Sequence, residues 1–283
     1  MIAIYPSVLY GEDFIVESMA SIRPYVSHIY VVLMKRPWGG TDGVMYKGEW
    51  VAWPEVFDRT RQRAALRDNV TIIDADKFSP WNRWGYAVND VVKPPPGTEV
   101  LLIDPDCVFE EVQAVRAFND WQAHPEYQWA SVRQIELWRT PAWQITRPRA
   151  MASFHRGDLA LLNSPDPPDG KPRTTPTSYF LEGRIHNLGF CCSPANTRWK
   201  HLTSLAFSPI VGETGPNPEW YEKTWLNWKP GDENLEPSLR CESAIPYAIP
   251  YDVVQLPAAI KRRYLAGEWD WATIPHFTGG PTP

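Results

Sequence analysis

Apolar and polar residues alternate in blocks along the first 125 residues, and the blocks predict strands and helices in turn. Apolar runs at 2–9, 27–34, 69–76 and 97–104 predict four strands. The segments 12–22, 54–66, 82–92 and 109–122 predict helices; acidic residues open the first, and a proline starts the second. Strands separated by helices at this spacing predict an α/β fold whose parallel sheet is covered on both faces.

The pattern changes after about residue 128. Residues 129–138 predict another strand, and 141–162 contain two more strand-like pieces. Residues 163–178 form a proline-rich loop, and 215–260 are rich in tryptophan and proline without a clear periodicity. We therefore expect one domain in two halves, an α/β half at 1–125 and a loop-rich elaboration of the same domain at 126–283.

Composition narrows the class of protein. No run of 18 apolar residues exists, so we expect no membrane insertion, and the N-terminus lacks the basic start of a signal peptide. The four cysteines, Cys107, Cys191, Cys192 and Cys241, form no CxxC pair, which is typical of reduced thiols in a cytoplasmic protein. A net charge of −5 argues against general wrapping of nucleic acid. The sequence does not indicate an oligomeric state.

Two Asp-x-Asp motifs follow apolar strands, at residues 74–76 and 104–106. Residues two apart on a strand share a face, so both carboxylates of a motif can approach one cation. Mg²⁺ and Mn²⁺ favour such ligands and leave room for phosphate oxygens. Ligands of open α/β sheets bind beyond the carboxyl ends of the strands, where both motifs lie. The alternative for either motif is a solvated turn, which we favour for the motif at 74–76. For the motif at 104–106, the family resemblance described next is what favours the metal site.

The order of these features resembles a known family. The opening strand leads into "YGEDFIVESM", a Gly-rich loop at 39–42 follows the second strand, and the fourth strand reads "VLLIDPD". In these segments the first 120 residues resemble nucleotide-sugar-dependent glycosyltransferases of the GT-A fold, closest to the family 2 type. The resemblance implies a Rossmann-like, mostly parallel central sheet with helices on both faces. It also implies a hexosyltransferase-type enzyme that uses Mn²⁺ or Mg²⁺ and a nucleotide-diphosphate sugar, with a UDP-sugar favoured.

The resemblance carries roles onto the motif at 104–106. Asp104 would lie near the ribose and the metal, and Asp106 would ligate the metal that holds the donor diphosphate. Some GT-A enzymes complete the metal shell with a histidine in a segment resembling "HxxGY", which His186 in "HNLGF" matches. A cation that meets the diphosphate follows in these enzymes, and here Lys200 or His201 could supply it. Without these roles, His186 would cap a turn and Lys200 would be solvated.

Further residues would contact the nucleotide. Asp74 would lie near the nucleobase. Arg83 and Asn89 match a cationic residue and an asparagine that follow strand three in the family. Pro6 and Tyr10, at the end of the opening strand, are expected on the same side. The segment "MKRPWGG" departs from the family's usual acidic end of strand two, so base recognition differs there.

Inverting transfer needs a general base, usually Asp or Glu, for the acceptor hydroxyl. Glu182 is the first candidate and Glu136 the second, each against the alternative of an ordinary solvated glutamate. Whether transfer inverts or retains configuration is not evident. Fifteen tryptophans are several times ordinary usage, and tryptophan faces stack on sugars as well as filling cores. We hypothesise that some of them form an acceptor platform: Trp138, Trp143, Trp225 and Trp228.

Two other functions compete with glycosyl transfer. A nucleotidyltransferase uses a similar sheet and metal site, but "SVLYGEDFI" lacks the glycines and arginine of its "GGxGxRL" loop. A non-catalytic carbohydrate-binding protein would account for the tryptophans alone. The acceptor of a transferase could be a modified DNA base, a protein or a glycan, in the host cytoplasm for a phage enzyme. The basic residues 261–263 could touch a phosphate backbone, or simply form a solvated helix end.

Overall fold

The computed structural model describes residues 1–8, 11, 13–34, 42–52, 68–75, 83–145, 149–156, 179–207, 217–233, 235 and 247–272. Its strands form a ten-stranded sheet and a separate hairpin. The strands of the large sheet are β1 (Ile2–Val8), β2 (His28–Met34), β5 (Val70–Ala75), β6 (Val100–Leu102), β7 (Cys107–Phe109), β8 (Trp129–Trp138), β9 (Thr140–Ile145), β10 (Arg149–His155), β11 (Tyr179–Phe190) and β12 (Ala248–Pro250). The hairpin consists of β3 (Gly43–Tyr46) and β4 (Glu49–Ala52).

The N-terminal strands form the parallel centre that the sequence predicts. They lie in the order β5-β2-β1-β6, and all three pairings are parallel. Their carboxyl ends therefore share one edge of the sheet. β2 lies on one side of β1 and β6 on the other, so the strand order reverses at β1. Such a switch point opens a crevice for ligands in α/β sheets.

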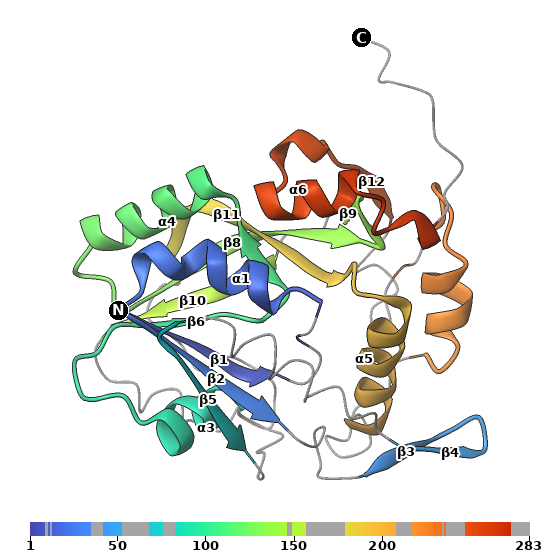
Figure 1. Cartoon of the computed structure of the whole chain (residues 1–283), viewed down its shortest axis with the longest axis horizontal. Coiled ribbons are helices and arrows are strands. Elements are labelled where there is room, and N and C mark those ends of the chain that lie inside the picture. The colour runs from blue at the N-terminus through green and yellow to red at the C-terminus, as the bar shows by residue number, and fades with distance from the viewer. Residues whose placement is uncertain are drawn as a thin grey trace.

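Helices lie on both faces of this parallel part, as expected. The helical elements are α1 (Ile15–Ile22), α3 (Arg83–Tyr86), α4 (Glu111–Ala123), α5 (Pro194–Phe207), α6 (Ala258–Leu265), the 3₁₀-helices η1 (Arg23–Tyr25), η5 (Val253–Gln255) and η6 (Asp270–Ala272), and the π-helices η2 (Ala87–Val92) and η4 (Tyr221–Leu226). α1 and α4 lie above the sheet and α3 below it (Figure 1). Tyr5 of β1 packs in the core of α1 and α4, whereas its neighbour Ile4 packs in the core of η2, as strand alternation requires.

The C-terminal half makes the sheet mixed. β10 is antiparallel to both β6 and β8, β9 and β12 extend the sheet beyond β8, and β11 runs parallel to β8. β7 pairs antiparallel with β11. β6 and β7 follow each other in the sequence but do not pair directly in the sheet. They are connected by the strand pairings β6–β10, β10–β8, β8–β11 and β11–β7. The sequence pattern predicted β8, β9 and β10 but not β7, β11 or α5.

Tryptophan side chains build a core cluster in this half. Trp138, Trp225 and Trp228 are each at most 2% exposed, and they pack with Trp220 against Phe190 and neighbouring residues. The indole N–H of Trp225 donates to the carbonyl of Phe190 at 2.9 Å. The hypothesis of an acceptor platform is therefore wrong for these three tryptophans, because buried rings cannot stack on a substrate. Trp143 is half-buried against the same cluster.

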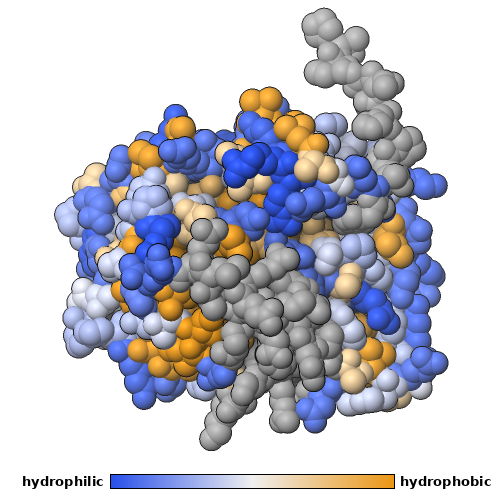
Figure 2. Space-filling view, in the orientation of Figure 1, coloured by the Kyte–Doolittle hydropathy of each residue, from blue (hydrophilic) through white to orange (hydrophobic). Residues whose placement is uncertain are grey.

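The described surface and helices are consistent with a sequence that has no long apolar segment. In the view of Figure 2 the described surface is mostly hydrophilic, with apolar residues in separate patches. Within the described ranges, no helix has the length and apolar character needed to cross a membrane.

A Gly183→Ala substitution is expected to lower the free energy of unfolding by roughly 2–5 kcal/mol. Gly183 has a φ of +104°, and an added Cβ would lie 2.6 Å from the carbonyl oxygen of Gln113 in α4. Left-handed backbone costs other residues about 1–2 kcal/mol, and overpacking typically about 1–3. Gly231→Ala is the matched control, because its φ is +95° and nothing lies within 4 Å. Urea unfolding that gave the same loss for both variants would contradict the clash.

Candidate functional site

The aspartates of the 104–106 motif lie in a turn, not on a strand. β6 ends at Leu102, and the carbonyl of Asp104 accepts a hydrogen bond from the amide of Cys107 at 3.0 Å. Pro105 takes the second position of this turn, where its fixed φ is favourable. The sequence argument that strand alternation puts both carboxylates on one face is therefore wrong in its geometry. Its location was correct, because the turn lies at the carboxyl edge beside β1. We call residues 104–106 the Asp turn.

Neighbouring elements hold the Asp turn from two sides. The hydroxyl of Ser18 in α1 donates to the carbonyl of Cys107 at 2.5 Å and lies 2.9 Å from the hydroxyl of Tyr5. On the other side, the amide of Leu188 in β11 donates to the carbonyl of Asp106 at 2.8 Å. The turn is thus fixed by β1, α1 and β11 together. This anchoring leaves the side chain of Asp106 only 15% exposed.

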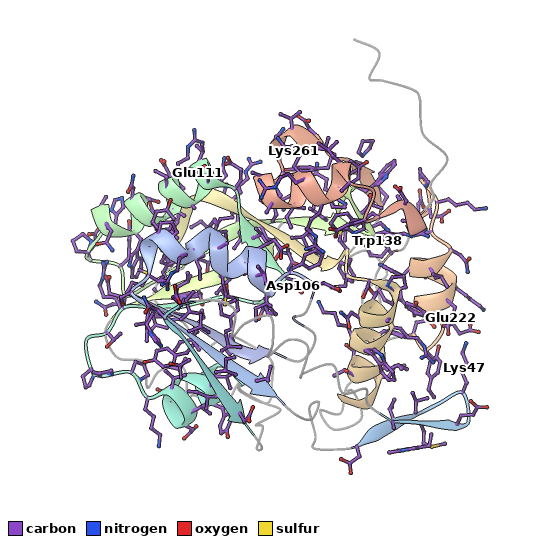
Figure 3. The ribbon with its side chains drawn as sticks, viewed as in Figure 1. Lys47, Asp106, Glu111, Trp138, Glu222 and Lys261 are labelled. Atoms are coloured by element: carbon purple, nitrogen blue, oxygen red, sulfur yellow. The ribbon has the colours of Figure 1, made fainter. Side chains whose placement is uncertain are left out.

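Lys200 of α5 supplies a cation to the turn. Its ammonium lies 2.5 Å from Oδ2 of Asp106 and 3.4 Å from the carbonyl of Gly189. Burial alone would lower the pKa of Lys200, but the charge of Asp106 and its hydrogen bond outweigh burial and raise that pKa well above its ordinary value. Lys200 is therefore charged at all physiological pH values. Asp106 lies near the middle of the molecule, between the sheet and α5 (Figure 3).

Gly189 leaves space for this ion pair. An added Cβ at Gly189 would lie 3.1 Å from Oδ2 of Asp106 and 3.7 Å from Nζ of Lys200. The amide of Gly189 donates to Oδ1 of Asn187 at 2.7 Å, which shapes the last residues of β11. The "HNLGF" segment thus builds the wall of the Asp turn through its asparagine and glycine.

Asp13 positions the helix that carries Lys200, a role that the sequence did not indicate. Its Oδ2 accepts hydrogen bonds from the amide of Ser193 at 3.0 Å, the hydroxyl of Ser193 at 3.3 Å and the side-chain amide of Asn196 at 2.8 Å. A carboxylate at a helix N-terminus also interacts favourably with the helix dipole. Asp13 lies 180 residues before Ser193, and no local pattern indicates such a distant cap.

His186 contacts a different group from the one expected. Its side chain is 1% exposed, and its Nε2 lies 2.7 Å from the hydroxyl of Tyr251. Burial lowers the pKa of His186 to about 4, so the ring is neutral at pH 7. Among the described residues, which include His186 and both aspartates of the turn, no group of three or more His, Cys, Asp and Glu side chains is arranged to hold a metal ion. The residues present therefore do not fit a metal held by His186 and both aspartates.

The two glutamates proposed as general bases lie apart from each other. Glu136 is 3% exposed in β8, in register with Asn187. Glu182 is exposed, and its amide donates to a carboxylate oxygen of Asp120 at 2.7 Å. Six positions of β11 separate Glu182 from Leu188 beside the turn, which corresponds to roughly 20 Å of strand. The structure does not bring Glu182 to the Asp turn, whereas Glu136 lies on the strand beside the segment that forms the wall of the turn.

The residues expected on the nucleotide are only partly described. Asp74 of β5 is exposed near the carboxyl end of that strand, at the same edge as the Asp turn. Pro6 is buried in β1, where the register with β2 shifts, and Asn89 is half-buried in η2. Tyr10, Asp76 and the side chain of Arg83 lie outside the described residues. Their roles stay predictions.

The described cysteines are free and buried: Cys107, Cys191 and Cys192. Burial raises the pKa of the Cys192 thiol to about 12, so it remains protonated at neutral pH. This agrees with the expectation of reduced thiols for these three residues. Cys241 lies outside the described ranges.

Comparison with known proteins gives weak matches only. No protein-family model matches the chain, and no curated protein is similar to it. Among solved structures, S. aureus TarS 1–349 is similar at a TM-score of 0.34 and 12% identity, over 57% of this chain and 48% of that one. The chain thus spans about half the length of that structure. Mannose-1-phosphate geranyltransferase from Thermus thermophilus is similar at a TM-score of 0.28 and 11% identity, over 88% of this chain and 72% of that one. At these values the interpretation of the site rests on its own geometry.

Proposed function

We propose that this chain is a glycosyltransferase of the GT-A type that moves a sugar from a nucleotide-diphosphate donor to a hydroxyl acceptor. The observation that carries the proposal is the pairing of Lys200 with Asp106 in a turn beside the point where the strand order reverses. Open α/β sheets bind their ligands at this point. A donor there would have its diphosphate next to a permanently charged ammonium. The reversed order around β1 supports the Rossmann-like half that the GT-A resemblance implies.

Lys200 would contribute charge stabilisation. In the transfer step the acceptor oxygen forms a bond to the anomeric carbon, and the bond from that carbon to the diphosphate oxygen breaks. Negative charge grows on the departing diphosphate, and a cation already fixed nearby stabilises it without reorganisation. Asp13 and Gly189 would support this role, the first by holding α5 and the second by leaving space at the ion pair.

Mn²⁺ or Mg²⁺ is part of the proposal as an ion shared with the donor. Mg²⁺ sites of this type commonly use one or two carboxylates, substrate phosphates and water rather than a full protein cage. Asp104 and Asp106 would hold such an ion, whereas His186, whose Nε2 lies 2.7 Å from the hydroxyl of Tyr251, would not take part. When bound, the ion would neutralise charge on the diphosphate. It would compete with Lys200 for Oδ2 of Asp106.

The acceptor proton needs a base, and Glu136 is now preferred to Glu182. Glu136 lies in register with Asn187, two residues before Gly189, whereas Glu182 lies far along β11. The acceptor itself, whether modified DNA base, protein or glycan, stays open. The tryptophan cluster no longer supports a non-catalytic carbohydrate-binding protein, because its rings are buried.

Calorimetric titration with UDP and GDP, each with and without Mn²⁺, tests the proposal. We expect Mn²⁺-dependent binding of one nucleotide, weakened at least tenfold in Asp106→Asn, because a charge-assisted contact is worth about 1.5–3 kcal/mol. Asp68→Asn is the matched control, since Asp68 is exposed just before β5 at the opposite edge of the sheet. No binding in any combination, or equal losses in both variants, would overturn the proposal. Turnover of a nucleoside triphosphate with release of pyrophosphate would favour a nucleotidyltransferase.

A further inference from the structure

A cleft is formed by residues other than those of the Asp turn. It has a volume of about 660 Å³ and is lined by residues of α4, β8, β11 and the segment around η5. Asp104, Asp106 and Lys200 are not among its lining residues. Its size is within the range of small-molecule sites, about 300–1,000 Å³. The part of β11 that lines it runs from Phe180 to His186, before the segment that contacts the turn.

Three arginines line this cleft: Arg116 of α4, Arg133 of β8 and Arg184 of β11. All three are exposed, and none forms a salt bridge or donates a hydrogen bond to another residue in the described ranges. Arginine presents a planar set of donors that matches phosphate oxygens in pairs. Three guanidinium groups from three elements are therefore available to one ligand.

Arg133 and Arg184 form an unusual cross-strand pair. They are register partners on the neighbouring parallel strands β8 and β11, so their side chains lie next to each other. Like charges at directly opposed positions destabilise a sheet. Within the described part of the chain, no carboxylate forms an ion pair with either of them. A repulsive pair at the wall of a cleft indicates that stability is given up for a ligand that neutralises both charges.

A bulge in β11 creates this pair. The register with β8 shifts between Leu181 and Arg184, and Gly183 there adopts a φ of +104°. The close approach of Gln113 to Gly183 also brings α4, with Arg116, against the cleft. Bulges are common next to functional sites, where they redirect a side chain.

Apolar and acidic groups complete the lining. The Arg133 guanidinium lies 5.4 Å from the centre of the Phe180 ring, which is 43% exposed, and Val254 is 70% exposed. Two carboxylates also line the cleft. That of Glu110 accepts a hydrogen bond from the amide of Gln113 at 3.1 Å, as a helix cap. Glu182 is exposed and limits the positive charge that a ligand would meet.

We propose that this cleft binds a small organic phosphate, with the phosphate between Arg133 and Arg184 and the organic part on Phe180 and Val254. Arg116 adds a third contact from α4. The proposal does not depend on the proposed transferase function, because no residue of the Asp turn takes part. Glu182 opposes binding, so its removal strengthens the site.

Calorimetry without divalent cations tests the cleft, with inorganic pyrophosphate, a nucleoside monophosphate and a hexose phosphate as probes. We expect saturable binding of one molecule per chain, weakened at least tenfold in Arg133→Gln and in Arg184→Gln and strengthened in Glu182→Gln. Lys229→Gln is the matched control, since Lys229 is exposed near η4 and carries the same charge. Asp106→Asn should leave this binding unchanged. A preference for one organic probe over pyrophosphate would identify the body that Phe180 and Val254 accept.

A melting-temperature measurement on the ligand-free protein separates a variant that has lost the binding site from one that has lost binding because it misfolds. Relief of repulsion should raise the melting temperature of ligand-free Arg184→Gln by about 1–2 °C. The proposal is overturned by an absence of saturable binding to every probe. The proposal would also be overturned if Lys229→Gln weakened probe binding as much as Arg184→Gln does. It would likewise be overturned if Asp106→Asn were the only variant that weakened this binding.

Discussion

Replacing Lys200 with methionine is expected to slow sugar transfer by roughly 10²–10³-fold, the range found when one fixed donor to a developing charge is removed. The same change should tighten Mn²⁺ binding at the Asp turn. The ammonium of Lys200 lies 2.5 Å from Oδ2 of Asp106, so it occupies a position that a metal ion would need. Methionine keeps most of the buried stem and removes only the charge. The two effects therefore have opposite signs in one variant.

The rate of sugar transfer is measured as release of the nucleotide from its sugar donor, with the nucleotide that binds in the calorimetric titration. The affinity for Mn²⁺ is measured by a separate titration. Lys223→Met is the matched control, because Lys223 pairs with Glu219 at 2.6 Å on the exposed surface of η4. Exposed pairs of this kind contribute little, so this variant should behave as the unmodified protein. An unchanged rate together with unchanged Mn²⁺ affinity in Lys200→Met would contradict both the charge role and the competition.

Lowering the pH from 7 to 5 is expected to reduce the free energy of unfolding by on the order of 5 kcal/mol. Three buried histidines cause this loss: His155, His186 and His201, which are 8%, 1% and 3% exposed. Burial lowers the pKa of each to about 4, from an ordinary value of 6.5. Between pH 6.5 and 4 the unfolded chain therefore binds protons that the folded chain does not. Stability is complete above pH 6.5 and falls as the pH drops, by roughly 2 kcal/mol per histidine at pH 5.

Urea unfolding at pH 7 and pH 5 measures this loss. Single substitutions to glutamine should each reduce the difference between the two pH values by about 2 kcal/mol, whatever they cost at pH 7. Because the whole stability of a domain is about 5–15 kcal/mol, the protein should approach acid unfolding near pH 4–5. A difference between pH 7 and pH 5 that all three variants retain in full would contradict the assignment to these histidines.

β1, β2 and β6 were predictable because they are mostly buried and appear as continuous apolar runs, and the edge strand β5 was predictable from its β-branched residues. The segment 129–138 predicted β8 correctly although it mixes apolar residues with Ser131, Gln134 and Glu136, which are buried as well. β11 and α5 were missed, since "EGRIHNLGFCCSPANTRWKH" mixes buried polar residues with apolar ones. Asn187 and Thr197 are buried there through tertiary contacts, which no local pattern reveals.

The candidate site was predicted in part. Asp104 and Asp106 were found because they end an apolar run, although their turn geometry was not. Lys200 came from the family resemblance rather than from periodicity. The cross-strand pair of Arg133 and Arg184 had no signal, because it depends on the register of two strands from distant segments. Side chains that meet only through long-range pairing lie beyond reasoning from local pattern.

The linkage of β6 and β7 through β10, β8 and β11 has a consequence for the order of folding. β1, β2, β5 and β6 with their helices can associate through contacts within the first half of the chain. The Asp turn is complete only when β7 has paired with β11 and Lys200, 94 positions after Asp106, has arrived. Closing such long loops costs entropy before any contact repays it, so these pairings form late. A chain still emerging during synthesis would thus hold a folded α/β half before it could hold a donor.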